Sequence, residues 1–167
     1  MLSLKINSLK NFMNHLLAGD TFDIFLLEEA TITTANTYHI DGHMEKSFFS
    51  EEELENENVC AYDFALWKDI KGLCFQLIKG KRTPLSFKFV LLLLPSYMEQ
   101  ILNKENLNID ISLLKSLVLT IKYDGNQAIL TTGSAYHSFL LSHEPDKIWD
   151  TNLLHYLNKK GIDYELL

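Results

Sequence analysis

The feature that most constrains the fold is an apolar run between Pro84 and Pro95, at the midpoint of the 167-residue chain. The run reads LSFKFVLLLL, so large apolar side chains occupy both odd and even positions. Because successive side chains of a strand point to opposite faces, neither face of this segment suits contact with water. Residues 83–95 are therefore predicted to form a buried central strand. The run is much shorter than the roughly 20 residues that a membrane-spanning helix needs, so no membrane contact is expected.

Two other segments are predicted to form β-hairpins. The first covers 31–49 and turns at Asp41-Gly42, and the second covers 117–132 and turns at Asp124-Gly125. An Asp-Gly pair supplies the positive φ angles that tight hairpin turns demand. Both turns are therefore placed at these two glycines.

Apolar residues at helical spacing predict the elements between these strands. The predicted helices lie between Ser8 and Gly19, over 62–79, from Pro95 to Leu102, and between Pro145 and Gly161. Short strands are predicted over 2–6 and 164–167. At this length the chain suits one domain, residues 1–167, with enough apolar surface to form a single core. The predicted fold class is α+β, built around a mainly antiparallel sheet.

The spacing of glycine and tryptophan residues suggests an internal duplication. Gly42 precedes Trp67 by 25 residues and Gly125 precedes Trp149 by 24. These intervals predict two similar strand, helix, hairpin, helix halves, about 1–82 and 83–167. The central apolar strand would then be the counterpart of the strand over 2–6. Chance correspondence of the intervals is the alternative.

The acidic charge of the chain is local. The formal net charge is -7, and five of the negative charges lie within 51–57, a segment predicted to form a solvated acidic turn. Arg82 is the only arginine. Because arginine supplies the planar fork that proteins favour for clamping phosphate and carboxylate groups, nucleic acid is not an expected partner. Lysines can still make weak contacts that are sensitive to salt.

No catalytic or metal-binding set is predicted. In a hairpin that turns at Asp41-Gly42, His39 and His43 lie on opposite faces, whereas a metal site needs three or four convergent ligands. The segment around His137 has no GxSxG elbow. The segment 80–83 lacks the spacing and hydroxyl of a phosphate-binding loop. We therefore expect no catalytic residues, no metal ligands and no cofactor.

Four side chains are candidates for a cleft between the two halves: Trp67, Trp149, His39 and His137. The two tryptophans are at matching places on the later helices and provide an aromatic wall for an apolar ligand or a partner segment. The alternative is that they pack their helices onto the sheet, as aromatic residues on an apolar helical stripe commonly do.

The chain resembles a domain-of-unknown-function family of Gram-positive, clostridia-type bacteria, DUF5721. The resemblance rests on the opening Leu-Lys-Ile, the segment ATITT at 30–34, IKGK at 78–81 and TPLSFKF at 83–89. It implies no activity. The order of strand, helix and Asp-Gly hairpin, used twice, is also similar to the repeat of DNA sliding clamps and to the modules of GyrI-like ligand-binding proteins. These two likenesses concern architecture only, and a fold does not determine a function.

The sequence favours a noncatalytic binding or protein-interaction domain, with a protein or a small apolar ligand as partner. One alternative is a small-molecule enzyme with a site between the halves that uses His39, His137, His143 and Asp41. A DNA-clamp-like protein is the other. The segment MLSLKI at 1–6 has no apolar run of signal-peptide length, and the central run is too short to span a membrane, so we expect a cytoplasmic protein. Cys60 and Cys74 form no CxxC or Cys/His cluster and are expected to be reduced thiols.

Overall fold

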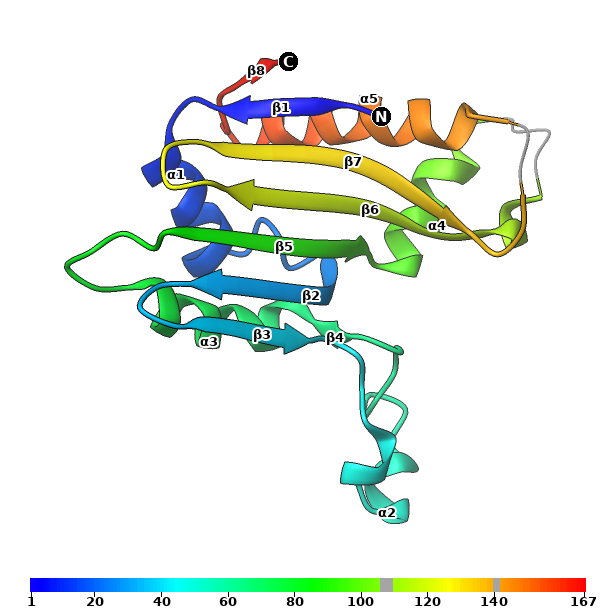
Figure 1. The fold of residues 1–167 in the computed structure, drawn as a ribbon. Helices are drawn as coiled ribbons and strands as arrows, with labels where there is room; N and C mark the ends of the chain where they lie inside the picture. The colour runs from blue at the N-terminus through cyan, green and yellow to red at the C-terminus, as the bar shows by residue number, and fades with distance from the viewer. Residues whose placement is uncertain (106–109, 140–141) are drawn as a thin grey trace.

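A computed structural model describes residues 1–105, 110–139 and 142–167. It contains one sheet with helices packed on one face (Figure 1). The strands are β1 (Ser3–Ile6), β2 (Phe25–Thr33), β3 (Thr37–Asp41), β4 (Ala65–Leu66), β5 (Ser86–Leu93), β6 (Leu114–Tyr123), β7 (Ala128–Tyr136) and β8 (Tyr164–Leu166). The α-helices are α1 (Leu9–Met13), α2 (Glu51–Leu54), α3 (Trp67–Ile78), α4 (Pro95–Asn103) and α5 (Glu144–Lys159). Three further helical turns are the π-helix η1 (Asn14–Ala18) and the 3-10 helices η2 (Lys46–Phe48) and η3 (Ile111–Leu113).

The strand order is β3-β2-β5-β6-β7-β1-β8, and β4 adds to β2 beside β3. Neighbouring strands along this order run antiparallel. The predicted α+β class is therefore confirmed. In the part of the chain that the structure describes, no helix has both the length and the apolar character to cross a membrane.

The central apolar run forms β5, as predicted, between β2 and β6. Phe87, Phe89 and Leu91 point toward the helices and are at most 4% exposed, and the Phe89 ring lies 5.2 Å from the Trp67 ring of α3. Val90 and Leu92 point to the other face of the sheet and are still only 8% and 6% exposed. Both faces of β5 are thus buried from Phe89 to Leu93, which explains why this part of the run lacks polar alternation.

The second hairpin forms as predicted. Residues 124–127 connect β6 to β7, and Gly125 has φ +98°. The Asp124 Oδ1 atom accepts hydrogen bonds from the backbone N–H groups of Asn126 and Gln127, both at 2.9 Å. These bonds fix the turn and hold the pKa of Asp124 below its usual range.

The predicted position of the first turn is wrong. β2 and β3 are joined at residues 34–36, where Thr33 pairs with Thr37, and Asp41 is the last residue of β3. Gly42 instead packs against a bulge in β2, and its N–H donates to the Glu28 carbonyl at 2.9 Å. A Cβ at Gly42 would lie 1.9 Å from the Leu27 carbonyl oxygen. The glycine is therefore needed for close backbone approach, and not for a turn.

Since the first hairpin ends at Gly42, residues 44–49 are not its return strand. From residue 45 on they belong to an arm, defined here as residues 45–58. The arm contains η2 and α2 and projects away from the sheet (Figure 1). The glutamates of the arm are all exposed, as predicted for a solvated acidic turn. The chain returns to the sheet through Phe64 and β4.

The expected equivalence of the strand over 2–6 with the central strand is wrong. β5 lies between β2 and β6, the first strand of each hairpin, whereas β1 lies between β7 and β8. A true repeat would place β1 beside its own hairpin strand β2, as β5 lies beside β6. The matching glycine-tryptophan intervals therefore do not correspond to matching places in the sheet.

Candidate functional site: an apolar groove with a cationic rim

A cavity of about 720 Å³ forms a groove at the end of the sheet where β5 begins. One wall is α1 with η1, and the other is the end of α3 with the loop 79–84 that leads into β5. The apolar part of the lining consists of Leu9, Met13, Leu17, Ala18, Phe75, Ile78, Pro84, Phe87 and Tyr123. A volume of this size lies within the range of ligand sites in proteins.

The apolar stripe of the first helix serves two surfaces. Phe12 and Leu16 are fully buried in the core beneath the sheet. Leu9 and Met13 are only half-buried, and both line the groove. The apolar stripe therefore extends beyond the part that packs in the core. Its remaining residues, Leu9 and Met13, form part of the groove floor.

The end of α3 extends this apolar surface. Phe75 lines the groove and is 41% exposed. Trp67 and Cys74 are the α3 side chains buried in the core. Single exposed apolar residues are common, but Phe75 adjoins a concave apolar site.

Four cations surround this apolar floor: Lys10, Lys79, Lys81 and Arg82. All four are exposed, and among the residues that the structure describes the groove lining includes no carboxylate. The chain as a whole has a net charge of -7. The rim is thus a locally positive surface on a chain whose net charge is negative. It includes Arg82, the single arginine of the chain.

Buried hydrogen bonds hold the two walls together. The Trp67 indole Nε1 of α3 donates to the Leu16 carbonyl of η1 at 3.0 Å. One turn further along α3, the Lys71 Nζ atom donates to the Gly19 carbonyl at 2.7 Å and pairs with Asp23 at 2.6 Å. These contacts fix α3 against η1, so the groove is a formed feature of the folded chain.

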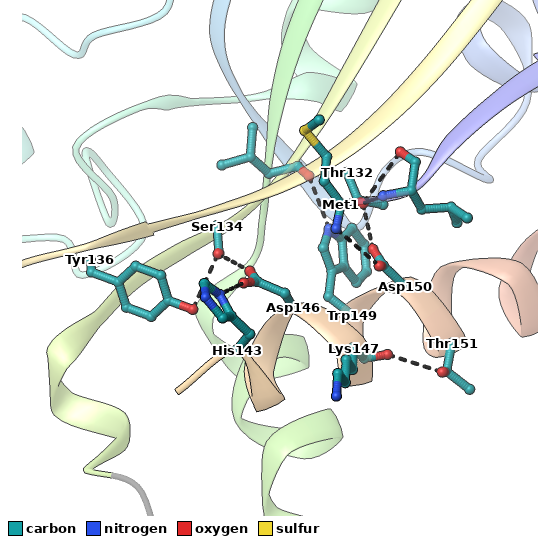
Figure 2. Close-up of polar contacts among 12 residues, drawn as sticks. Met1, Thr132, Ser134, Tyr136, His143, Asp146, Lys147, Trp149, Asp150 and Thr151 are labelled. Carbon is teal, nitrogen blue, oxygen red and sulfur yellow. Dashed lines mark hydrogen bonds and ion pairs between the residues drawn. The ribbon is translucent and has the colours of Figure 1, made fainter. Parts of the chain in front are cut away.

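A second cluster of reactive side chains lies where β7 meets α5 (Figure 2). The Ser134 hydroxyl donates to Asp146 Oδ1, and His143 Nδ1 lies 3.2 Å from Asp146 Oδ2. In a serine nucleophile triad the histidine stands between the serine and the carboxylate. Here the carboxylate stands between them, so His143 cannot take the serine proton.

The same cluster has a clear structural role. Thr132 donates to Asp150 in parallel with the Ser134–Asp146 bond, and the Trp149 indole donates to the Val118 carbonyl at 2.9 Å. These bonds join α5 to β6 and β7 along two turns of the helix. Burial raises the pKa of Tyr136 and keeps its phenol neutral, so this hydroxyl can donate to the Ser134 oxygen, 3.2 Å away.

The predicted placement of His39 and His43 on opposite faces is wrong, because it depended on a turn at Asp41-Gly42. With Asp41, the two histidines line one small polar pocket beside Glu29. The groups in it have other partners: His39 bonds Thr31 at 3.1 Å, the Asp41 carboxylate accepts from the His43 backbone N–H, and Glu29 pairs with Lys88. No three His, Cys, Asp or Glu side chains among the described residues converge closely enough to hold a metal ion.

The other three cleft candidates lie in different places. Trp67 is fully buried, and Trp149 is 3% exposed with its ring 6.2 Å from that of Phe25. Trp149 also lines a small pocket between α4 and α5. His137 lines a pocket near the base of the arm. The structure therefore brings neither tryptophan together with His39 or His137.

The groove itself was not predicted. Its lining residues come from three distant parts of the sequence, and Leu9, Met13 and Leu17 belong to the same apolar stripe as the core residues of their helix. The one available signal was the concentration of Lys79, Lys81 and Arg82 directly after a helix.

The two cysteines are free thiols, and Cys74 is fully buried in α3. Burial raises the pKa of its thiol from 9.0 to about 12. Between these values the unfolded chain binds fewer protons than the folded chain, so stability falls as the pH rises. We expect the free energy of unfolding to fall more steeply from about pH 7 to about pH 10 in the wild type than in Cys74→Ala. Urea titrations at both pH values measure this.

Cys60→Ala is the matched control for this experiment, since it removes the half-buried thiol and leaves Cys74 in place. It should keep the steep pH dependence of the wild type. Equal slopes for Cys74→Ala and the wild type would contradict the prediction.

Comparison with known proteins identifies the family. No curated protein and no solved structure is similar enough to count as a match. A family of unknown function matches residues 15–165, a span that includes both the α3 wall of the groove and the arm. The match extends over most of the sequence, and the chain therefore belongs to the DUF5721 family.

Proposed function

We propose that this protein is a noncatalytic interaction domain whose groove binds an acidic, amphipathic peptide segment of a partner protein. The observation that carries the proposal is the combination of an apolar floor with a rim of four cations and no described carboxylate. An apolar helix or strand face would bury its large side chains on Met13, Phe75 and Phe87. Its acidic residues would then face the rim.

The two parts of the groove contribute differently to binding. Burial of apolar surface supplies most of the affinity, at about 25 cal/mol per Å² removed from water. The exposed cations add little individually, but together they select for negative charge and raise the association rate. A peptide suits the site because Phe75, which lines the groove, is 41% exposed, so the apolar surface reaches the open edge of the groove, where an extended partner segment can contact it.

The test uses a fluorescein-labelled helical peptide of about 14 residues, with Leu and Phe on one face and Glu on the other. We expect fluorescence anisotropy to show binding that weakens with added NaCl. The double variant Lys79→Glu/Lys81→Glu should bind the peptide at least about tenfold more weakly, because it reverses half of the rim. Phe75→Ser should also weaken binding, with little effect on folding, since its side chain is already 41% exposed.

Lys68→Glu/Lys147→Glu is the matched control, because it changes the net charge equally at two exposed lysines outside the groove. It should alter the affinity by less than about twofold. A short DNA duplex of similar charge serves as a second probe and tests the clamp-like alternative. Equal peptide affinity in the groove variant and the control, or tighter binding of DNA than of the peptide, would overturn the proposal.

We also propose a cytoplasmic location. Free thiols at Cys60 and Cys74 support it, because cysteines in oxidising compartments are commonly paired in disulfides.

A further inference from the structure

The arm, residues 45–58, has the chemical character that the groove would accept. It contains six glutamates and one lysine. Two of its apolar side chains face water: Phe48 is 84% exposed and Leu54 is 37% exposed. The arm therefore presents apolar side chains surrounded by negative charge, whereas the groove presents apolar side chains surrounded by positive charge.

The arm is shaped by local hydrogen bonds within itself. The Ser50 hydroxyl accepts from the Glu53 N–H at 3.1 Å, and the Glu53 carboxylate accepts from the Ser50 N–H at 3.0 Å. This capping box starts α2, and the Phe48 and Phe49 rings pack edge to face, 5.3 Å apart. A four-residue helix gains little stability in isolation, so contact with another surface would stabilise it. Burying Phe48 would also remove a large apolar ring from water.

We propose that the arm of one copy of this chain binds in the groove of a second copy. This inference rests on the proposed function, because it names the acidic segment that the groove binds. Phe48 and Leu54 would lie on the apolar floor, and Glu51, Glu52 and Glu55 would face the cationic rim.

An arm cannot reach the groove of its own chain. The groove lies at the end of the sheet where β5 begins, next to the loop 79–84. The arm leaves the sheet at Gly42 and returns at Phe64, which shares a pocket with Leu92 and Leu93 at the other end of β5 (Figure 1). The two surfaces are thus separated by the length of the strand, and the contact must be between copies.

Because the two contacting surfaces are different, the association is heterologous. Each copy has one arm and one groove, so copies join head to tail, either in a closed ring or in an open chain. Two apolar side chains and a few exposed ion pairs form a small interface, below about 1,200 Å², which is typical of weak and transient association. We therefore expect association that increases with protein concentration and decreases with salt.

Sedimentation velocity tests this with the full chain at concentrations from about 10 to about 500 μM. The average mass of the wild type should rise across this range. It should remain that of a monomer for the groove variant Lys79→Glu/Lys81→Glu and for the arm variant Phe48→Ser/Leu54→Ser. The control Lys68→Glu/Lys147→Glu should associate like the wild type.

A mixing experiment distinguishes contact between an arm and a groove from a dimer in which arm contacts arm or groove contacts groove. The arm variant keeps an intact groove, and the groove variant keeps an intact arm. Mixed together, they should form a complex of two copies that does not grow, since no second arm and groove remain to continue the chain. Arm charge reversal, Glu52→Lys/Glu55→Lys, should restore association when it is combined with Lys79→Glu/Lys81→Glu.

The outcomes separate the two proposals. A wild type that stays monomeric at every concentration, while its groove binds the acidic peptide, overturns the arm as occupant and leaves the proposed function intact. A wild type that associates equally well with and without the arm substitutions also overturns this inference. If neither the peptide nor the arm binds, both proposals fail.

Discussion

Trp67→Ala is expected to lower the free energy of unfolding by about 3–5 kcal/mol. Trp67 is among the largest fully buried side chains, and its ring packs on Phe89 of the central strand. The substitution leaves a cavity between α3 and the sheet and removes the hydrogen bond to the Leu16 carbonyl. Urea denaturation followed by circular dichroism measures the loss. A decrease below about 1 kcal/mol would show that the packing of α3 is not an important source of stability.

Trp67→Phe separates the two effects of that substitution. It keeps an aromatic ring on Phe89 and removes the Nε1 donor, so we expect a smaller loss, about 1–2 kcal/mol. Because this bond joins the two walls of the groove, the variant should also bind the acidic peptide more weakly at temperatures where it is fully folded. Unchanged peptide affinity would mean that Lys71 alone holds the walls in place.

Gly42→Ala is expected to destabilise the fold by roughly 2–3 kcal/mol, although it adds only one methyl group. The new Cβ would lie 1.9 Å from the Leu27 carbonyl oxygen and 2.7 Å from the carbonyl carbon. Both are backbone atoms of β2, so the strand or the base of the arm must shift. Denaturation in urea measures the effect.

Gly72→Ala is the control for this substitution. Gly72 lies on the exposed side of α3, and a Cβ there would meet no atom within 4 Å. Because glycine is a poor helix former, alanine should stabilise α3 by up to about 1 kcal/mol. The same substitution, glycine to alanine, is thus expected to lower the stability of the fold at Gly42 and to raise it at Gly72. A loss at Gly72 similar to that at Gly42 would contradict the role given to close backbone approach.

The sequence predicts those parts of the fold in which one residue pattern has one physical explanation. The run before Pro95 is apolar on both faces, and a central strand is the element that buries both. At Asp124-Gly125 the aspartate accepts from the turn N–H groups and the glycine has a positive φ, as expected for a hairpin. These two features allow β5, β6 and β7 to be placed correctly.

The first hairpin was misplaced because a glycine can be required for two reasons. At Gly125 the reason is a positive φ, whereas at Gly42 it is the neighbouring carbonyl of Leu27. The latter depends on a bulge in another strand, which a local sequence pattern does not reveal. The actual turn at 34–36 contains no glycine at all.

The candidate site was missed for a related reason. Met13 has the spacing of a core residue, and only the packing of α1 against α3 shows that it borders a groove together with Phe75. The acidic segment 51–57 was correctly predicted to be exposed. Its relation to the groove emerges only when Phe48, a neighbour in sequence, is seen to be exposed as well.

The position of β1 in the sheet has a consequence for how the chain folds. Ser3 pairs with Thr131, and Leu4 pairs with both Leu130 and Leu166. β1 therefore leaves the ribosome before both of the strands that pair with it, and it lacks these partners until β7 and then β8 have been made. Such long-range pairing slows folding, because a large loop must close before the contact forms. During synthesis Leu4 and Ile6, both buried in the finished sheet, remain without their neighbours until β7 emerges.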